Sequence, residues 1–472
     1  MMAQSPKEER LLLAEDVVEI YRDGQSLEAA CRITFSLKTS PSVSVEINVD
    51  PQMEVGAVAR LTFRNSGVTF DGFLTRASYS ENVEAWFVPH LSGPISVGSA
   101  KNLARVDFAF INFKQFYRQS ADGPMHRNTV DLCGGGWRVQ IRPLPGDLAS
   151  FDRYRQAGAG DRRFTHSATL MREDGSEFSS DACRRALTAL HVFLSFANGQ
   201  WMTFVLVRGF TATGEVAWQE WGTRWIERLI EILDVWFETM HGEALAEAFP
   251  GFFDAWSLNQ CSEDAIHTAV YWYLRSNSLG AGADGGLLLT QAALESLSRH
   301  VLVEARGTLS KGGHKALRAS DRIRRLLAEL TIPIQIPPSS EQLSAATPSW
   351  DDGPHAVTAI RNSVTHSYES SGSPPVFEAW QLAQWYLELT LLRLFAFSGS
   401  YSNRTKQGKY IGQVDPNAVI LTGPNSVQAC RAQEHKTRLP DHRCATHAGR
   451  DQTLLLSIAL CVVLSYLRAA KN

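Results

Sequence analysis

Polar and apolar residues alternate along the first third of the chain. One such run covers residues 33–37 and a second covers residues 43–49, on either side of Ser40-Pro41-Ser42. A period of two is typical of strands that bury one face. Shorter apolar runs follow, separated by Gly, Pro, Asn and Asp, at residues 60–63, 106–113 and 137–141. The pattern predicts a β-rich N-terminal domain over residues 1–175, built as a sandwich or a barrel.

Near residue 180 the period changes to that of a helix. Ser179-Ser180-Asp181 is a helix-start signal, and apolar residues follow at helical spacing up to Asn198-Gly199. Two strands are expected next, at residues 201–210 and 216–221. The sequence then favours a helix up to about Trp256, with a core-facing stripe of Trp225, Leu229, Ile232 and Trp236. Residues 176–256 therefore form a predicted connecting α/β segment.

Residues 257–415 show helical periodicity almost throughout. The expected helices cover residues 262–276, 287–305, 315–330, 355–367 and 376–397. The Pro- and Ser-rich stretch of residues 331–354 is expected to be a long surface loop. The pattern predicts a C-terminal helical bundle, and the chain as a whole is expected to be α+β. Residues 416–472 lack clear periodicity before a final apolar run, and we expect a poorly ordered basic tail there.

Composition narrows the class of protein. The chain has 472 residues and a net charge of −3, which argues against a surface that is basic throughout for general DNA binding. Seven cysteines, an odd number, favour a reducing compartment over a disulfide framework. The apolar run of residues 454–467 is shorter than the roughly 18–20 residues that span a bilayer. We expect a cytoplasmic protein without a membrane segment.

One polar motif stands out in the fourth helix of the predicted bundle. It reads Arg361-Asn362-Ser363-Val364-Thr365-His366 and follows the long loop directly. At 100° per residue, Asn362 and His366 share a face of the helix, whereas Arg361 points about 140° away from His366. Arg361 and His366 of one helix therefore do not easily meet.

The pattern R-N-x-x-x-H in a helical bundle resembles the HEPN superfamily. The stretch Gly399-Ser-Tyr401-Ser-Asn403-Arg404, soon after the last long helix, resembles the Apea-like HEPN group in particular. The β-rich half is similar in layout to the large domain that often precedes such bundles. The resemblance implies a metal-independent endoribonuclease without a cofactor, formed by two facing bundles, with a frequent setting in prokaryotic defence against phage. It does not explain residues 416–472.

The implied chemistry suits the motif residues. His366 titrates near neutrality, as general acid or base work requires, and Arg361 offers a permanently charged fork for phosphate oxygens. Asn362 is expected to orient the phosphate or the imidazole. Attack by a ribose 2′-hydroxyl makes RNA the expected substrate. Because one convincing motif is present, catalysis requires a homodimer.

Two alternatives remain open for the bundle. Many HEPN bundles do not cleave RNA and serve as interaction or nucleotide-binding scaffolds. In the second alternative, Arg361, Asn362 and His366 form a structural polar network at a helix end and bond to Asp351 and Asp352.

Basic residues near the motif are candidates for RNA binding. Arg318, Arg322 and Arg325 lie on common faces of the third helix, where they form either a solvated face or a phosphate-binding surface. Tyr401, Arg404 and Lys406 form a second candidate patch, in which an aromatic ring would stack on exposed bases. The β-rich half would detect an unknown trigger.

Two further patterns are interpreted as structural. Gly280 to Gly285 match G-x-G-x-x-G but follow a predicted helix instead of a strand, so an interhelical loop is expected. The tail contains cysteines and histidines whose spacing matches no common zinc finger, and no metal site is expected there. These tail residues are Cys430, His435, His442, Cys444 and His447.

Overall fold

A computed structural model gives the fold of most of the chain up to residue 417. It describes residues 10–22, 25–36, 42–48, 58–65, 67–77, 84–89, 94–119, 125–145, 163–222, 224, 226–227, 233–345, 350–365, 374–406 and 408–417. The predicted basic tail, with its cysteines and histidines, lies outside these residues apart from its first two positions. The fold is α+β, with β-rich structure first and helices afterwards, as the sequence predicts.

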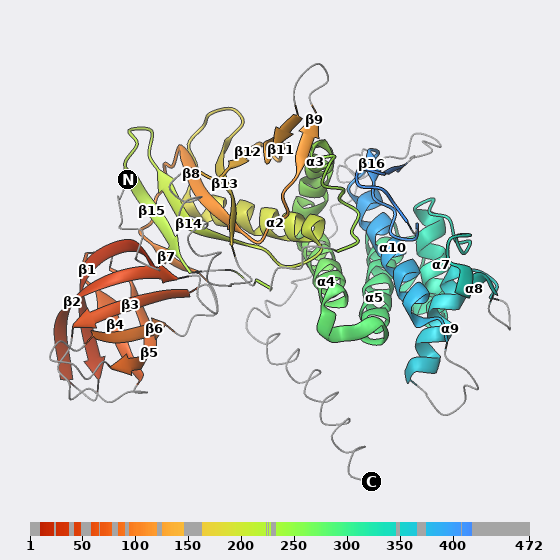
Figure 1. Cartoon of the computed structure of the whole chain (residues 1–472), viewed down its shortest axis with the longest axis horizontal. Helices are drawn as coiled ribbons and strands as arrows, with labels where there is room; N and C mark the ends of the chain where they lie inside the picture. The colour runs from red at the N-terminus through yellow and green to blue at the C-terminus, as the bar shows by residue number, and fades with distance from the viewer. Residues whose placement is uncertain are drawn as a thin grey trace, which may run out of the picture. The chain divides into compact units, whose positions relative to one another are not determined.

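The N-terminal strands close into a barrel in the order β1-β2-β3-β6-β5-β4 (Figure 1). The antiparallel pairing of β1 with β4, through Val18 and Phe63, closes it. The alternating residues predicted to face inward are buried on β2 and β3, among them Ile33, Phe35 and Val45. The six strands are β1 (Arg10–Arg22), β2 (Gln25–Ser36), β3 (Ser42–Asn48), β4 (Val58–Phe63), β5 (Thr69–Ala77) and β6 (Glu84–Pro89).

A second sheet of seven strands follows, in the order β11-β12-β13-β8-β14-β15-β7. Its strands are β7 (Ile95–Val97), β8 (Arg105–Ile111), β11 (Val130–Gly134), β12 (Trp137–Pro143), β13 (Phe164–Arg172), β14 (Thr203–Phe210) and β15 (Val216–Trp221). Strands β14 and β15 match the two expected after residue 200. Since β14 pairs with β8, the predicted boundary between residues 175 and 176 falls inside one sheet.

The two faces of β8 belong to two different cores. Val106, Phe108 and Phe110 join the large core that also includes α2 (Ser180–Asn198), whereas Ala109 and Ile111 join the core of the barrel. Alternation along one strand thus supplies both cores, because neighbouring side chains point to opposite faces of a sheet. Helix α2 begins where predicted, with Ser179 Oγ accepting a hydrogen bond from the Ala182 N–H at 3.2 Å.

The helix expected between residue 222 and Trp256 is partly wrong. The described residues from 233 to 242 are irregular, and helix α3 (Glu243–Ser257) begins only afterwards. Trp236 is fully buried as predicted, but from irregular backbone, where it packs against Phe196 and Phe397. The other three residues of the expected stripe lie outside the described residues.

The C-terminal part is a set of packed helices (Figure 1). They are α4 (Gln260–Asn277), the 3₁₀ turn η1 (Leu279–Ala281), α5 (Gly282–Arg299), the π-helical turn η2 (His300–Ala305), α6 (Lys311–Ala316), α7 (Ala319–Glu329), α8 (Glu341–Ala345), α9 (Gly353–Thr365) and α10 (Val376–Leu394). The glycine-rich stretch at 280–285 forms the turn and the start of α5. Short strand pairs complete the fold: β9 (Tyr117–Gln119) with β10 (Met125–Arg127), and β16 (Ser400–Tyr401) with β17 (Asp415–Pro416).

The third predicted helix, residues 315–330, is divided in two. Leu317 and Arg318 are extended, so α6 ends before them and α7 begins after them. Ser310 caps α6 by accepting a hydrogen bond from the Gly313 N–H at 3.0 Å, a contact that starts this helix before Lys315. Among the described residues, no helix is both long and apolar enough to cross a bilayer.

Candidate functional site

Helix α9, which carries the motif, is fixed tightly at its first turn. Asp352 Oδ1 accepts a hydrogen bond from the His355 N–H at 2.8 Å, as a helix cap does. The same carboxylate accepts hydrogen bonds from Arg324 of α7 at 2.5 and 3.1 Å. Gly353 passes so close to α10 that an added Cβ would lie 1.9 Å from Tyr386 Oη. The start of α9 is thus locked to both neighbouring helices.

The motif occupies the other end of α9. Val357 and Ile360 form the buried stripe, while Arg361 is half-buried and Asn362 is exposed. Arg361 Nη1 donates to Asn362 Oδ1 at 3.3 Å, and Arg361 Nε is buried without a hydrogen-bond partner in the described part of the chain. The end of α9 therefore presents a guanidinium that no described carboxylate neutralises.

The acidic residues considered as partners of the motif are bonded elsewhere. Asp352 pairs with Arg324, and Asp351 lies 3.1 Å from His355 Nδ1. Both lie before the first turn of α9, roughly 13 Å along the helix axis from Arg361 at 1.5 Å per residue. A network of Arg361 with Asp351 and Asp352 is therefore wrong for the described residues. His366 lies outside the described residues, so its assignment stays a prediction.

The three arginines predicted to bind phosphate on the third helix differ in surroundings. Arg318 and Arg325 are exposed. Arg322 is half-buried and pairs with Glu295 of α5 at 2.9 Å. The first two are therefore available to a ligand, whereas Arg322 already has a partner.

The second predicted RNA-binding patch is not an exposed surface. Tyr401 is 5% exposed and its Oη accepts a hydrogen bond from Trp385 Nε1 at 3.0 Å. Arg404 is 2% exposed and pairs with Glu388 at 2.7 Å. Base stacking on Tyr401 and phosphate contact by Arg404 are therefore wrong for this fold. Lys406 is exposed and pairs with Asp415 at 2.6 Å.

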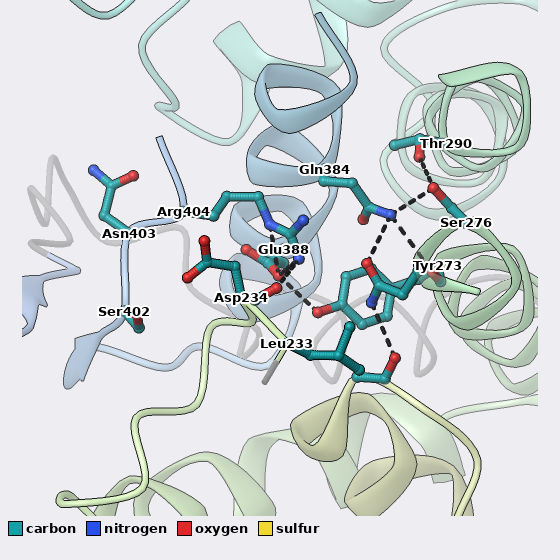
Figure 2. Close-up of polar contacts among 12 residues, drawn as sticks. Leu233, Asp234, Tyr273, Ser276, Thr290, Gln384, Glu388, Ser402, Asn403 and Arg404 are labelled. Carbon is teal, nitrogen blue, oxygen red and sulfur yellow. Dashed lines mark hydrogen bonds and ion pairs between the residues drawn. The ribbon is translucent and has the colours of Figure 1, made fainter. Parts of the chain in front are cut away.

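Arg404 instead belongs to a buried polar cluster between α10, α4 and the segment before α3. Figure 2 shows Arg404 and Tyr273 converging on the Glu388 carboxylate. Tyr273 Oη donates to Glu388 Oε1 at 2.6 Å, and Arg404 also donates to the Asp234 carbonyl oxygen at 2.6 Å. One turn away, Gln384 Nε2 donates to Ser276 Oγ at 2.6 Å. The cluster joins α4, α10, the segment before α3 and the segment after β16.

Charges in the cluster are set by these contacts. Burial opposes the charge of Arg404, but Glu388 holds the pKa of Arg404 above its ordinary value. Burial and the Glu388 charge raise the pKa of Tyr273, so this hydroxyl stays a donor. Burial also lowers the pKa of the nearby Lys114 to about 8, and Lys114 Nζ donates to the Leu233 carbonyl oxygen at 3.1 Å. Glu388 Oε1 accepts all the hydrogen bonds of this ion pair, while Glu388 Oε2 is buried without a partner in the described structure. The buried ion pair with its own donors suits a structural role.

Glu388 and Tyr273 were not among the residues predicted from the sequence. A signal for Glu388 is nevertheless present, because it stands in the apolar run of α10 between Leu387 and Leu389, where an isolated acid needs a buried partner. Nothing local identifies that partner as Arg404. In the described residues, no group of three His, Cys, Asp or Glu side chains is placed to hold a metal ion.

Comparisons with known proteins find similarity in two parts of the chain. Residues 259–415 match the YopA C-terminal domain, and residues 98–231 match the YopA central domain. The SPbeta prophage-derived uncharacterized protein YopA of Bacillus subtilis (strain 168) is 26% identical over 265 residues, which are 54% of this chain and 57% of that protein. No solved structure matches. The resemblance to HEPN proteins stays a prediction. The strands from β8 to β15 with α2, and the helices from α4 to α10, therefore lie in the parts of the chain that are similar to the central and C-terminal domains of YopA proteins.

Proposed function

We propose that the helical domain is a metal-independent endoribonuclease of the HEPN type that works as a homodimer. The state of Arg361 carries this proposal. Its guanidinium is held at the end of α9, and its one bond within the described residues is to Asn362. A half-buried positive charge without a carboxylate is poorly compensated, and a phosphate oxygen is a suitable partner for it.

The proposed reaction needs no group beyond the motif. The ribose 2′-oxygen attacks the adjacent phosphorus and the 5′-oxygen leaves, giving a 2′,3′-cyclic phosphate and a 5′-hydroxyl. His366 takes the proton from the 2′-hydroxyl and delivers it to the leaving 5′-oxygen. Arg361 stabilises the charge that develops on the phosphate, and Asn362 orients it. Because helical spacing predicts directions about 140° apart for Arg361 and His366, the proposal takes the two residues of one site from different copies of the chain.

The wider setting is part of the same proposal. The β-rich half senses a trigger or restrains the nuclease, and the protein acts in the cytoplasm against phage. The name of the Bacillus subtilis relative assigns that relative to a prophage, which supports a phage-related setting. A noncatalytic scaffold built on the same bundle is the competing function.

The test is RNA cleavage by the purified full chain in EDTA. Wild type, Arg361→Ala and His366→Ala are compared with Thr365→Ala, a control on the same turn whose hydroxyl bonds only to carbonyls of its own helix in the described structure. We expect cleavage by wild type and the control, and a loss on the order of a hundredfold or more in the other two. Equal cleavage by all four would reject the site. Absence of cleavage by wild type, with RNA binding intact, would favour the scaffold.

Mixing the two inactive variants tests the dimer. A heterodimer of Arg361→Ala with His366→Ala contains one site with both native residues and one with neither. We expect the mixture to regain part of the wild-type activity. Absence of recovery, with exchange of subunits demonstrated, would show that each chain supplies a whole site by itself.

A further inference from the structure

A basic cavity opens on the helical domain between α5, η2, α6 and α7. Its volume is about 540 Å³, within the usual range for ligand sites. Four cationic residues line it against the single acid Glu295, namely Arg299, Lys311, Lys315 and Arg322. A concave lining of mostly one sign concentrates ligands of opposite charge.

The one acidic residue of the lining is already neutralised. Glu295 Oε2 accepts a hydrogen bond from Arg322 Nη1 at 2.9 Å, and Oε1 accepts one from Gln291 Nε2 at 2.9 Å. Arg322 also donates to the carbonyl oxygens of His314 and Lys315, both at 3.1 Å. Arg322 therefore fixes the end of α6 and acts as a positioning residue for the rest of the cavity.

The lysines of the lining have no such partners. Lys311 and Lys315 are four residues apart on α6, so they lie on one helix face. Both are exposed, and neither makes an ion pair within the described ranges. Beside Lys311, a Cβ added at Gly312 would meet no atom within 4 Å, which shows open space there. Arg299 is 62% exposed and pairs with Glu304 at 3.1 Å.

His314 responds to the positive charge around the cavity. It is 8% exposed, and its Nε2 lies 2.9 Å from Ser298 Oγ. Burial, together with the charges of Arg322 and Arg299, lowers the pKa of His314. The imidazole is therefore neutral near pH 7, and the free cations that remain at the cavity are the lysines.

We propose that this cavity binds backbone phosphates of single-stranded RNA, with Lys311 and Lys315 contacting the phosphate oxygens. The choice of RNA rests on the proposed function, whereas phosphate binding does not require cleavage. The cavity is larger than one phosphate, and its cations are spread over more than one helix, an arrangement suited to successive phosphates of a strand.

The test is binding of a fluorescein-labelled oligouridylate, measured by anisotropy over a salt series. All proteins carry Arg361→Ala, so cleavage does not enter the measurement. The cavity variant is Lys311→Gln with Lys315→Gln. The matched control is Lys101→Gln with Arg138→Gln, which removes the same charge from exposed positions that neither line the cavity nor belong to the candidate RNA-binding residues.

We expect the cavity variant to bind on the order of tenfold more weakly, or weaker still. The slope of log affinity against log salt concentration should become less steep by about 1.4, because each phosphate that a lysine no longer neutralises reduces the slope by about 0.7. The control should change affinity only a few-fold, and Lys311→Arg with Lys315→Arg should bind RNA as wild type does.

Equal weakening in the cavity variant and the control would reject the cavity as the binding site, in favour of diffuse electrostatic attraction. Binding of inorganic phosphate at the cavity with unchanged RNA affinity would overturn RNA as the source. If RNA binding depends on the cavity but wild type does not cleave RNA, the binding proposal holds and the proposed nuclease function is rejected.

Discussion

Two polar regions of the helical domain, the buried cluster around Arg404 and the end of α9 at Arg361, differ in the presence of a carboxylate partner. Arg404 is buried and pairs with Glu388 at 2.7 Å, whereas Arg361 bonds to Asn362 alone among the described residues. In the sequence both arginines stand beside polar residues. A basic residue is therefore a candidate for ligand binding when the fold gives it no carboxylate partner.

Removal of the buried carboxylate should give the largest effect on stability. Glu388→Gln leaves the Arg404 charge buried without its counter-charge, and we expect a loss of about 3–5 kcal/mol in the free energy of unfolding. Lys406→Gln is the matched control, because it breaks a pair in which the lysine side chain is 45% exposed, and it should cost at most about 1 kcal/mol. Urea unfolding measures both. If both variants lose similarly little free energy of unfolding, the buried pair of Arg404 and Glu388 does not stabilise the fold.

The contrast between a tightly packed and an open part of the same domain can be tested by adding a methyl group. Gly353→Ala places a Cβ against Tyr386 Oη and should cost about 1–3 kcal/mol through overpacking. Gly312→Ala on α6 meets open space and should be neutral or slightly stabilising. Thermal unfolding of both variants measures the difference. A neutral Gly353→Ala would show that the first turn of α9 adjusts freely.

A buried group without any charge partner extends the comparison to the seven-stranded sheet. His166 is fully buried among Phe110, Phe113 and Phe116, and neither ring nitrogen has a hydrogen-bond partner in the described structure. Burial, reinforced by the charge of Arg127, lowers the pKa of His166 from 6.5 to about 3. The native state therefore excludes a proton that the unfolded chain binds.

Acid should destabilise the fold through His166. The stability that neutral His166 supports is complete above pH 6.5 and is lost as the pH falls from 6.5 towards 3. Between pH 7 and pH 5 the loss from this group is about 2 kcal/mol. His166→Phe should remove that part of the acid sensitivity, as urea unfolding at the two values measures. An unchanged pH dependence in the variant would mean that the imidazole titrates alike in the folded and the unfolded chain.

Arg361→Ala should change stability far less than Glu388→Gln. No described ion pair is lost, so we expect the free energy of unfolding to stay within about 1 kcal/mol of wild type, while cleavage is abolished. A loss as large as that of Glu388→Gln would show that Arg361 has a structural partner, and the contrast between Arg361 and Arg404 would fail.

Local pattern was sufficient for much of the fold. Strands β3, β12, β14 and β15 and helices α2, α4 and α10 lie close to their predicted positions because period and capping are properties of neighbouring residues. The prediction of a helix in the segment before α3 was wrong, because an apolar stripe does not identify the residues that will cover it. Trp236 is covered by Phe196 and Phe397 without a helix being formed.

The sequence alone determined the α+β class, the position of the motif helix and the grouping of basic residues near it. Only the tertiary structure decided which of those basic residues remain available. Arg404 finds Glu388 on α10 and the Asp234 carbonyl much earlier in the chain, and Arg322 finds Glu295 on α5. These partners are distant in sequence, and the burial that makes their pairing decisive exists only after the helices pack. Lys311 and Lys315 emerged as the unpaired cations of the cavity for the same reason.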